Sequence, residues 1–279
     1  HFGSVNTFLK LKDNSGKKVL TWFHFTEDNK KNSEVLKNQD EIDIVHTSCD
    51  LTKKELVDFG IKQEKIKVIP LGVDLETFFP ATHDEKIKIR KSLGIPDGKI
   101  VVGSFQKDGH GWKQGLEPKL IKGPDIFVEA IEKLKLLNIP VFVLLTGPCR
   151  GYVETELNKR NIPFLSAGFL KDTQEVAPYY RALDLYLITA RKEGGPQAVL
   201  EAMASGIGLV STKVGMAVDV LGDELLANDV SEIVQKAQKI IQDSQFREQV
   251  IKENLEKAKA YSWDKIAERY FKELYSQFL

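Results

Sequence analysis

The chain has 279 residues, of which 42% are hydrophobic and 29% are charged, which is ordinary for a folded protein. Its 40 basic and 40 acidic residues cancel, so no overall field favours nucleic acid or an anionic membrane as a partner. The two cysteines, Cys49 and Cys149, are too few for a disulfide framework or a cysteine-rich zinc site. No apolar stretch approaches the roughly 20 residues that span a bilayer, and no secretory signal is present. We therefore expect a cytoplasmic protein.

Short apolar runs separated by longer amphipathic stretches predict the fold. The runs are 19–23, 42–48, 99–105, 141–147, 183–189 and 207–212. They are continuous rather than alternating, which is typical of strands buried on both faces of a parallel sheet. Between them lie helical stretches such as 123–138, where apolar residues recur at helical spacing at Ile126, Ala130, Leu134 and Leu137. Repeated strand–helix–strand units indicate a doubly wound α/β fold.

The segment 68–80 predicts a packed hinge, because turn-forming residues interrupt a stretch too apolar for a free linker. It divides the chain into an N-terminal lobe at 1–72 and a larger lobe at 73–260. Helical stretches close the chain, and Ser262 is a suitable N-cap for the last of them. We expect this final helix, within 261–279, to pack back on the N-terminal lobe.

The loop after the run at 183–189 is the densest candidate site. It leads through Gly194 and Gly195 to Pro196, which suits the first position of a helix because its missing N–H would be unpaired there. Glycines let a ligand approach the backbone closely. A helix N-terminus favours phosphate through its free N–H groups and its dipole. In an open α/β sheet, ligands also bind at the carboxyl ends of the strands. The loop therefore predicts a phosphate site.

Two carboxylates frame this loop, Glu193 before it and Glu201 within the helix. At about 1.5 Å of rise per residue, Glu201 lies roughly 7–8 Å along the helix from Pro196. One acid could reach a sugar on the outer side of a diphosphate while the other binds a ribose on the inner side. Alternatively, Glu193 only favours the helix dipole and Glu201 is solvated. The neighbouring glycines, the proline and the buried strand favour the functional interpretation.

These motifs have a family resemblance. KEGGPQAVLEAMASGIGLVST closely resembles the signature of glycosyltransferase family 4, in which two glutamates flank a Gly-Pro loop before an Glu-Ala-Met-Ala helix. KVIPLGVDLETFFP, APYYRALDLYLIT and YSWDKIAERY resemble further segments of that family, in the expected order. The resemblance covers most of the chain. It implies a GT-B fold of two Rossmann-like lobes with parallel sheets, and retaining transfer from a nucleotide-diphosphate sugar without a metal or another cofactor.

The resemblance also implies roles for individual residues. Glu193 matches the glutamate against the donor sugar, Glu201 the ribose-binding glutamate, and Lys122 the lysine that neutralises the diphosphate, a role that suits a leaving group gaining charge. The loop lining the sugar and diphosphate matches Gly194, Gly195, Pro196 and Gln197. His24 follows a strand, as the family's active-site histidine does. Alternatively, His24 has only a structural role, and Lys122 is an ordinary surface lysine before a helix.

The chain departs from the family pattern at 101–123. The family commonly has a short loop with an arginine before the lysine, whereas this longer loop is rich in glycine and contains no arginine. We expect Lys107 to replace that arginine as a donor-binding residue, with a point charge in place of a planar fork. Trp112 either stacks on a sugar or base or pins the loop to its lobe, and the sequence leaves both interpretations open.

Residues 1–25 resemble the middle of a GT-B lobe, so we expect the N-terminal lobe to be incomplete and one sheet edge to be exposed. Self-association through that edge is one consequence.

A nucleotide-sugar-binding module with little or no transfer is the alternative function. An epimerase or phosphorylase of the same fold is less well supported, and no GxGxxG motif supports a dehydrogenase. The nucleobase, the sugar and the acceptor (a saccharide, lipid or small molecule) stay open, as does peripheral membrane contact.

Overall fold

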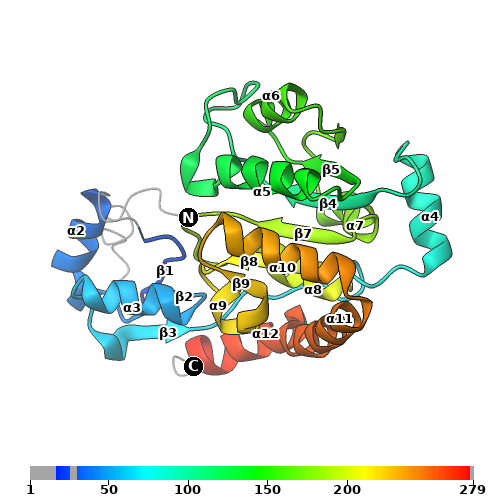
Figure 1. The fold of residues 1–279 in the computed structure, drawn as a ribbon. Helices are drawn as coiled ribbons and strands as arrows, with labels where there is room; N and C mark the ends of the chain where they lie inside the picture. Colours follow the sequence, from blue (N-terminus) through cyan, green and yellow to red (C-terminus); the bar gives the residue numbers. More distant parts are fainter. Residues whose placement is uncertain (1–16, 26–29, 277–279) are drawn as a thin grey trace.

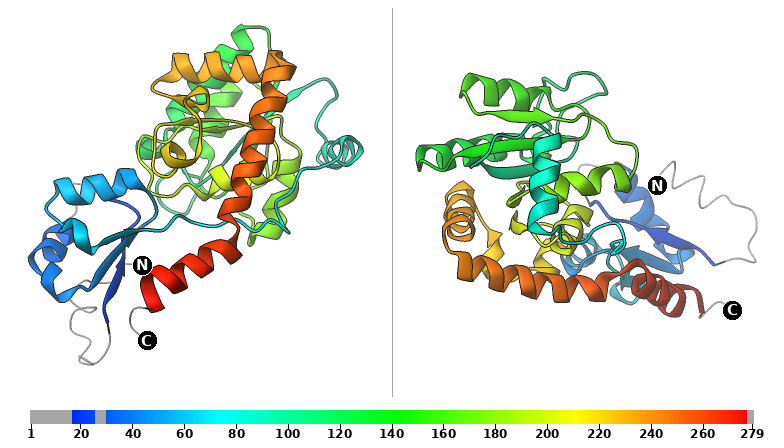
Figure 2. Two further views of the ribbon diagram at one scale, coloured as in Figure 1. Left: turned by 90° about the horizontal axis from the view of Figure 1, so that it is seen from below. Right: turned by 90° about the vertical axis from the view of Figure 1, so that its right-hand side faces the viewer.

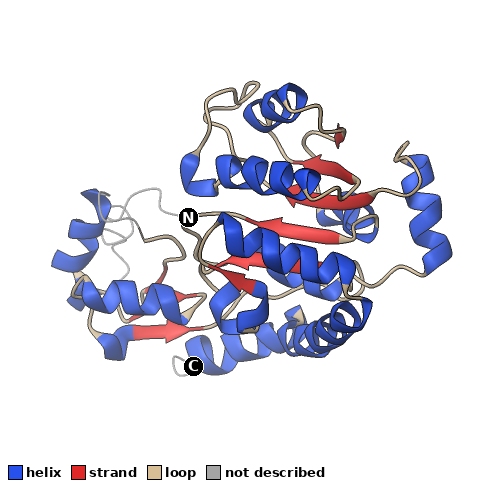
Figure 3. Cartoon of the chain, viewed as in Figure 1, coloured by secondary structure: helices blue, strands red, loops and turns tan. Residues whose placement is uncertain are grey.

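The computed structural model describes residues 17–25 and 30–276, which form two α/β lobes (Figure 1). Among the described residues, none of the helices combines the length and the apolar character needed to cross a bilayer. Each lobe is built on a parallel sheet with helices packed against it (Figure 3). The fold class predicted from the sequence is therefore confirmed.

The N-terminal lobe has a three-stranded sheet in the order β1–β2–β3. Its strands are β1 (Val19–Thr21), β2 (Ile44–Thr47) and β3 (Ile66–Val68), and its helices are α2 (Lys30–Lys37) and α3 (Asp50–Asp58). The core between sheet and helices consists of buried apolar side chains, namely Leu20, Trp22, Phe25, Val35, Ile42, Val45, Leu56, Ile61 and Ile66.

The C-terminal lobe has a six-stranded sheet in the order β6–β5–β4–β7–β8–β9. Numbered within the lobe, this is the order 3-2-1-4-5-6 of the Rossmann fold, which reverses direction between β4 and β7. The strands are β4 (Ile100–Phe105), β5 (Val141–Thr146), β6 (Phe164–Ser166), β7 (Leu185–Ile188), β8 (Gly208–Thr212) and β9 (Leu226–Ala227). Every residue of β5, β7 and β8 is buried, as the continuous apolar runs predict.

Helices cover both faces of this sheet (Figures 1 and 3). The helices of this lobe are α4 (His83–Ser92), α5 (Pro124–Leu136), α6 (Gly151–Lys159), α7 (Thr173–Arg181), α8 (Gln197–Ala204), α9 (Ala217–Val220), α10 (Val230–Gln242) and α11 (Ser244–Ala258), of which α4 stands at the edge. The helix predicted at 123–138 is confirmed as α5, but its buried face differs in part from the prediction. Leu137 follows the helix and is exposed, whereas Phe127, Val128 and Ile131 are buried.

The chain crosses between the lobes twice, and the two crossings pair with each other. The Val73 N–H donates to the Tyr261 carbonyl at 2.8 Å, and the Trp263 N–H donates to the Val73 carbonyl at 3.1 Å. Beyond this point α12 (Trp263–Tyr270) leaves the direction of α11 and runs beneath the N-terminal lobe (Figure 2). Ser262 caps α12 through the Lys265 N–H, as predicted.

The final helix contacts the N-terminal sheet through apolar side chains. Ile266 of α12 packs with Ile44 of β2 and with Ile69, which follows β3. The chain continues from α12 into a π-helical turn, Phe271–Tyr275, whose Leu274 joins the same cluster. The domain boundaries at 72 and 260 stay a prediction, as does the incompleteness of the N-terminal lobe.

Candidate active site

The candidate site lies at the carboxyl ends of β4 and β7, where the sheet order reverses. Such a reversal leaves a crevice between the two connecting loops, and ligands of open α/β sheets bind there. The loop after β7 is joined to the start of α5: the Thr189 hydroxyl donates to the Gly123 carbonyl at 2.9 Å, and the Arg191 N–H donates to the Ile121 carbonyl at 2.9 Å. These bonds bring Lys122 and Glu193 together from positions 71 residues apart.

Lys122 and Glu193 form an ion pair beside the contact between the lobes, where Gly194 lies against Phe23. Both side chains are largely removed from solvent, with 23% and 10% of their surfaces exposed, so their attraction is screened less than at an open surface. The predicted catalytic glutamate and the predicted diphosphate lysine are therefore neighbours, and in this structure each neutralises the other.

His24 of the N-terminal lobe faces the same pair. The His24 side chain is exposed at this contact between the lobes. Partial desolvation by its neighbours lowers the pKa of His24, the charges of Lys122 and Lys119 lower it further, and the charge of Glu193 opposes them. The imidazole therefore stays neutral at pH 7 and can donate one hydrogen bond and accept another. Three of the predicted site residues thus meet where the two lobes face each other.

The glycine loop brings the lobes into direct backbone contact. A side chain at Gly194 would collide with the carbonyl of Phe23, and one at Gly195 would lie 2.9 Å from the Ser48 hydroxyl. The close approach that these glycines permit in the structure is therefore that of the N-terminal lobe itself. α8 begins at Gln197, and Pro196 is its N-cap, one residue earlier than the first helical position expected for it. That difference is within the usual uncertainty of a helix end.

Glu201 lies apart from this group, in a pocket of the C-terminal lobe. The hydroxyl of Tyr180 donates to its Oε2 at 2.8 Å. Burial raises the pKa of Glu201, and the Tyr180 hydrogen bond partly offsets that effect. Tyr180 is itself fully buried, with the rings of Phe105 and Tyr186 packed around it. The aromatic cluster therefore holds the Glu201 carboxylate in one orientation.

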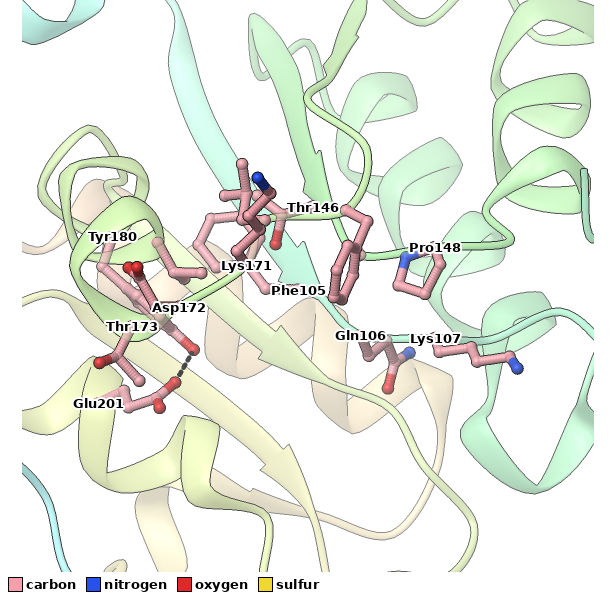
Figure 4. Close-up of a pocket in the computed structure, with 14 residues that line it drawn as sticks. Phe105, Gln106, Lys107, Thr146, Pro148, Lys171, Asp172, Thr173, Tyr180 and Glu201 are labelled. Carbon is pink, nitrogen blue, oxygen red and sulfur yellow. Dashed lines mark hydrogen bonds between the residues drawn. The ribbon is translucent and has the colours of Figure 1, made fainter. Parts of the chain in front are cut away.

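The pocket has a volume of about 320 Å³, at the lower end of the size usual for small-ligand sites. Figure 4 shows Glu201 and Lys107 on opposite sides of it. Its lining comes from the segments after β4, β5 and β6 and from two helices, namely Phe105, Gln106, Lys107, Thr146, Gly147, Pro148, Phe169, Leu170, Lys171, Asp172, Thr173, Val176, Tyr180 and Glu201. Most of these residues carried no signal in the sequence, although Tyr180 lies in one of the family-like segments.

The predicted residues thus fall into two groups at one end of the sheet. One group, at the contact between the lobes, consists of His24, Lys122, Glu193 and the glycine loop, whereas Lys107 and Glu201 line the pocket. Lys107 does not join Lys122: its ammonium lies over the ring of Trp112, 3.5 Å from the ring centre. Among the described residues, no three His, Cys, Asp or Glu side chains gather as a metal site would require.

Comparisons with known proteins show which proteins this chain resembles. The family model described as "Glycosyl transferases group 1" matches residues 115–243. The D-inositol 3-phosphate glycosyltransferase of Stackebrandtia nassauensis is 26% identical over 82% of this chain and 53% of its own length. The lipopolysaccharide core mannosyltransferase LpsB of Rhizobium meliloti is 31% identical over 53% of this chain and 40% of its own length. The chain is therefore similar in sequence to group 1 glycosyltransferases, and it shares its fold with solved structures.

Solved structures share the fold of this chain. HepE of Anabaena, solved with UDP and glucose, has a TM-score of 0.79 at 17% identity, over 93% of this chain and 72% of HepE. The sucrose-phosphate synthase of Thermosynechococcus elongatus has a TM-score of 0.74 at 19% identity, over 93% of this chain and 67% of the synthase. The chain spans about half the length of the curated relatives it matches. The narrower assignment to glycosyltransferase family 4 stays a prediction.

Proposed function

We propose that this protein transfers a sugar from a nucleotide-diphosphate sugar to an acceptor, with retention of anomeric configuration and without a metal or another cofactor. The main support for the proposal is that His24, Lys122 and Glu193 lie together at the contact between the lobes, at the same end of the sheet as the pocket that contains Glu201. A donor placed across the carboxyl ends of β4 and β7 would reach both groups.

The nucleoside fits the pocket of the C-terminal lobe. A carboxylate accepts hydrogen bonds from both hydroxyls of a ribose, and Glu201 is fixed for that task by Tyr180. The rings of Phe105 and Phe169 give the pocket apolar walls. HepE, which shares this fold, was solved with UDP and with UDP-glucose, so a UDP-sugar is the first donor to test.

The diphosphate would lie between the pocket that contains Glu201 and the ion pair of Lys122 and Glu193. The start of α8 has no side-chain cap, and although the Val199 N–H donates to the Pro196 carbonyl at 3.0 Å, those of Gln197 and Ala198 can face phosphate oxygens there. Lys122 supplies a positive charge beside that helix start. As the glycosidic bond breaks, negative charge grows on the diphosphate, and a fixed ammonium and helix dipole stabilise it more in the transition state than before it.

The sugar would then lie against Glu193 and His24. With Lys122 drawn towards the diphosphate, the Glu193 carboxylate is released to face the sugar, where it can accept hydrogen bonds and stabilise positive charge at the anomeric carbon. Neutral His24 adds a hydrogen bond without a competing positive charge. This division of roles makes Glu193 a residue of turnover and Glu201 a residue of binding.

The test separates binding from turnover in the full chain. Calorimetry with UDP-, GDP- and ADP-glucose measures binding, and chromatography of the released nucleoside diphosphate measures donor consumption with and without simple sugars as acceptors. Binding together with release supports a transferase. Binding without release, with any acceptor offered, would instead support the alternative of a nucleotide-sugar-binding module. Absence of binding to all three donors would contradict both.

A further inference from the structure

The segment 107–118, which follows β4, folds back on itself as a hairpin. Its two ends are joined by an antiparallel bridge between Gly109 and Pro118. Beside that bridge the Lys119 N–H donates to the Asp108 carbonyl at 2.7 Å. The hairpin therefore has a defined shape of its own, although it is the part of the chain that departs most from the family pattern.

The hairpin is packed backbone to backbone against the turn after β5. The Gly151 N–H donates to the Gln114 carbonyl at 2.8 Å. A side chain at Gly109 or at Gly115 would collide with the carbonyl of Cys149. Glycine at these positions is therefore required for contact, and the contact fixes where the hairpin stands on the lobe.

A buried ion pair connects the start of the hairpin to the turn after β5. Arg150 and Asp108 are both almost fully buried and lie 3.1 Å apart. The guanidinium also donates to the carbonyls of Ser104, Gln106 and Thr146 at 2.6, 3.1 and 2.9 Å. Burying two charges costs desolvation, and a buried charge tolerates few positions of its partner. The pair therefore holds the hairpin in one place relative to the ends of β4 and β5.

Trp112 lies on this fastened hairpin with 81% of its surface exposed. The interpretation that it pins the loop is therefore wrong, because Asp108, Arg150 and the glycine contacts do that. The ring touches Lys107, whose ammonium lies 3.5 Å from the ring centre, and Lys107 also lines the nucleoside pocket. A large aromatic ring is thus presented on a rigid support, one side chain away from the pocket.

We propose that Trp112 is a stacking surface for the base of the bound nucleotide. This inference rests on the proposed function, since it requires a nucleotide in the pocket with its ribose at Glu201. The base then extends across the pocket towards the side formed by Lys107 and Pro148 (Figure 4). Lys107 orients the indole by a cation–π contact, and the free parts of the ring are available to the base. Phe169, also exposed, borders the pocket from the segment after β6.

The test compares full-length Trp112→Ala with a control on the same hairpin, Leu116→Ala. Leu116 is also exposed, but it lines a different groove, beside Lys113 and Glu154, whereas Trp112 touches Lys107 of the nucleoside pocket. Calorimetry measures binding of UDP, GDP and ADP, of the matching nucleosides, and of inorganic pyrophosphate. Base–aromatic stacking corresponds to a loss of roughly 5- to 100-fold on removal of the ring. We expect that loss for the diphosphate and nucleoside that wild type binds best, and unchanged affinities for pyrophosphate and for Leu116→Ala.

Fluorescence gives a second readout that a merely structural role would not produce. The nucleotide should quench tryptophan emission in wild type and in Trp263→Phe, and the quenching should be absent in Trp112→Phe. Equal affinity of Trp112→Ala and wild type, equal loss for pyrophosphate, or full quenching in Trp112→Phe would each overturn the inference while leaving the proposed function intact. Absence of nucleotide binding by wild type would instead overturn the proposed function, and this inference with it.

Discussion

The ammonium of Lys122, two residues before α5, is paired with the carboxylate of Glu193, in the loop after β7. Both residues are proposed to contact the donor, but in this structure, which contains no donor, they form an ion pair with each other. A carboxylate that faced an anionic diphosphate alone would repel it, whereas the pair is neutral. When the donor binds, the Lys122 ammonium can be shared between the diphosphate and the Glu193 carboxylate. This costs less than burying a new, unpaired charge at the contact between the lobes.

Replacement of Lys122 by Met should weaken binding of the nucleoside diphosphate at least tenfold and leave binding of the nucleoside nearly unchanged. The lysine is proposed to contact only phosphate, and the loss also leaves Glu193 without its partner, facing the ligand's charge. Calorimetry with both ligands measures the difference. Lys133→Met is the matched control, since Lys133 pairs with Glu129 in an exposed ion pair on α5. An equal loss for nucleoside and diphosphate would indicate damage to the fold instead.

Glu193→Gln and Glu201→Gln should affect different kinetic quantities. Because Glu193 is proposed to face the reacting sugar, its variant should lower kcat by about 100-fold or more with a small change in donor KM. Glu201 is proposed to bind the ribose, so its variant should raise the dissociation constant of the nucleotide about tenfold. Steady-state kinetics and calorimetry on both proteins measure these quantities. Small and equal effects in the two variants would contradict the roles proposed for Glu193 in turnover and for Glu201 in nucleotide binding.

The activity should depend on pH through His24. Because partial desolvation and two lysines lower the pKa of His24 below its ordinary value of 6.5, the residue becomes charged only in more acidic solution. Its contribution to folding is complete above pH 6.5 and is lost as pH falls through the lowered pKa. A cation there would oppose positive charge on the sugar, so kcat/KM should fall on the acidic side. His24→Asn should lose that acidic limb, and an unchanged limb in the variant would exclude His24 as its origin.

Gly194→Ala should lower the free energy of unfolding by about 1–3 kcal/mol, as overpacking usually does, and should open the contact between the lobes. The new methyl group would meet the backbone carbonyl of Phe23, which cannot rotate away. At Gly195 the neighbours are the side chains of Ser48 and Leu71, which can shift. Gly195→Ala is therefore the control with the smaller expected loss. Urea denaturation of both variants decides whether backbone crowding distinguishes the two positions.

The sequence predicts most elements of the C-terminal lobe because their strands are continuous apolar runs. The loop before α8 is also predictable, because its glycines and proline are recognisable within a few residues of sequence. β6 and β9 are missed because they have only three and two residues, too short for a recognisable pattern. The long-range partners of charged residues are a different problem. The pairing of Arg150 with Asp108 joins residues from two segments, and no local pattern indicates it. The same holds for Lys122 with Glu193, whose proximity only the family resemblance implied.

The proposed donor site can be tested by a crystal structure of the protein with the best-binding nucleoside diphosphate. We expect the ribose hydroxyls within hydrogen-bond distance of the Glu201 carboxylate and the diphosphate between Lys122 and the start of α8. A nucleotide bound elsewhere, such as in the polar groove beside Lys113 and Glu154, with Glu201 still bonded only to Tyr180, would contradict it.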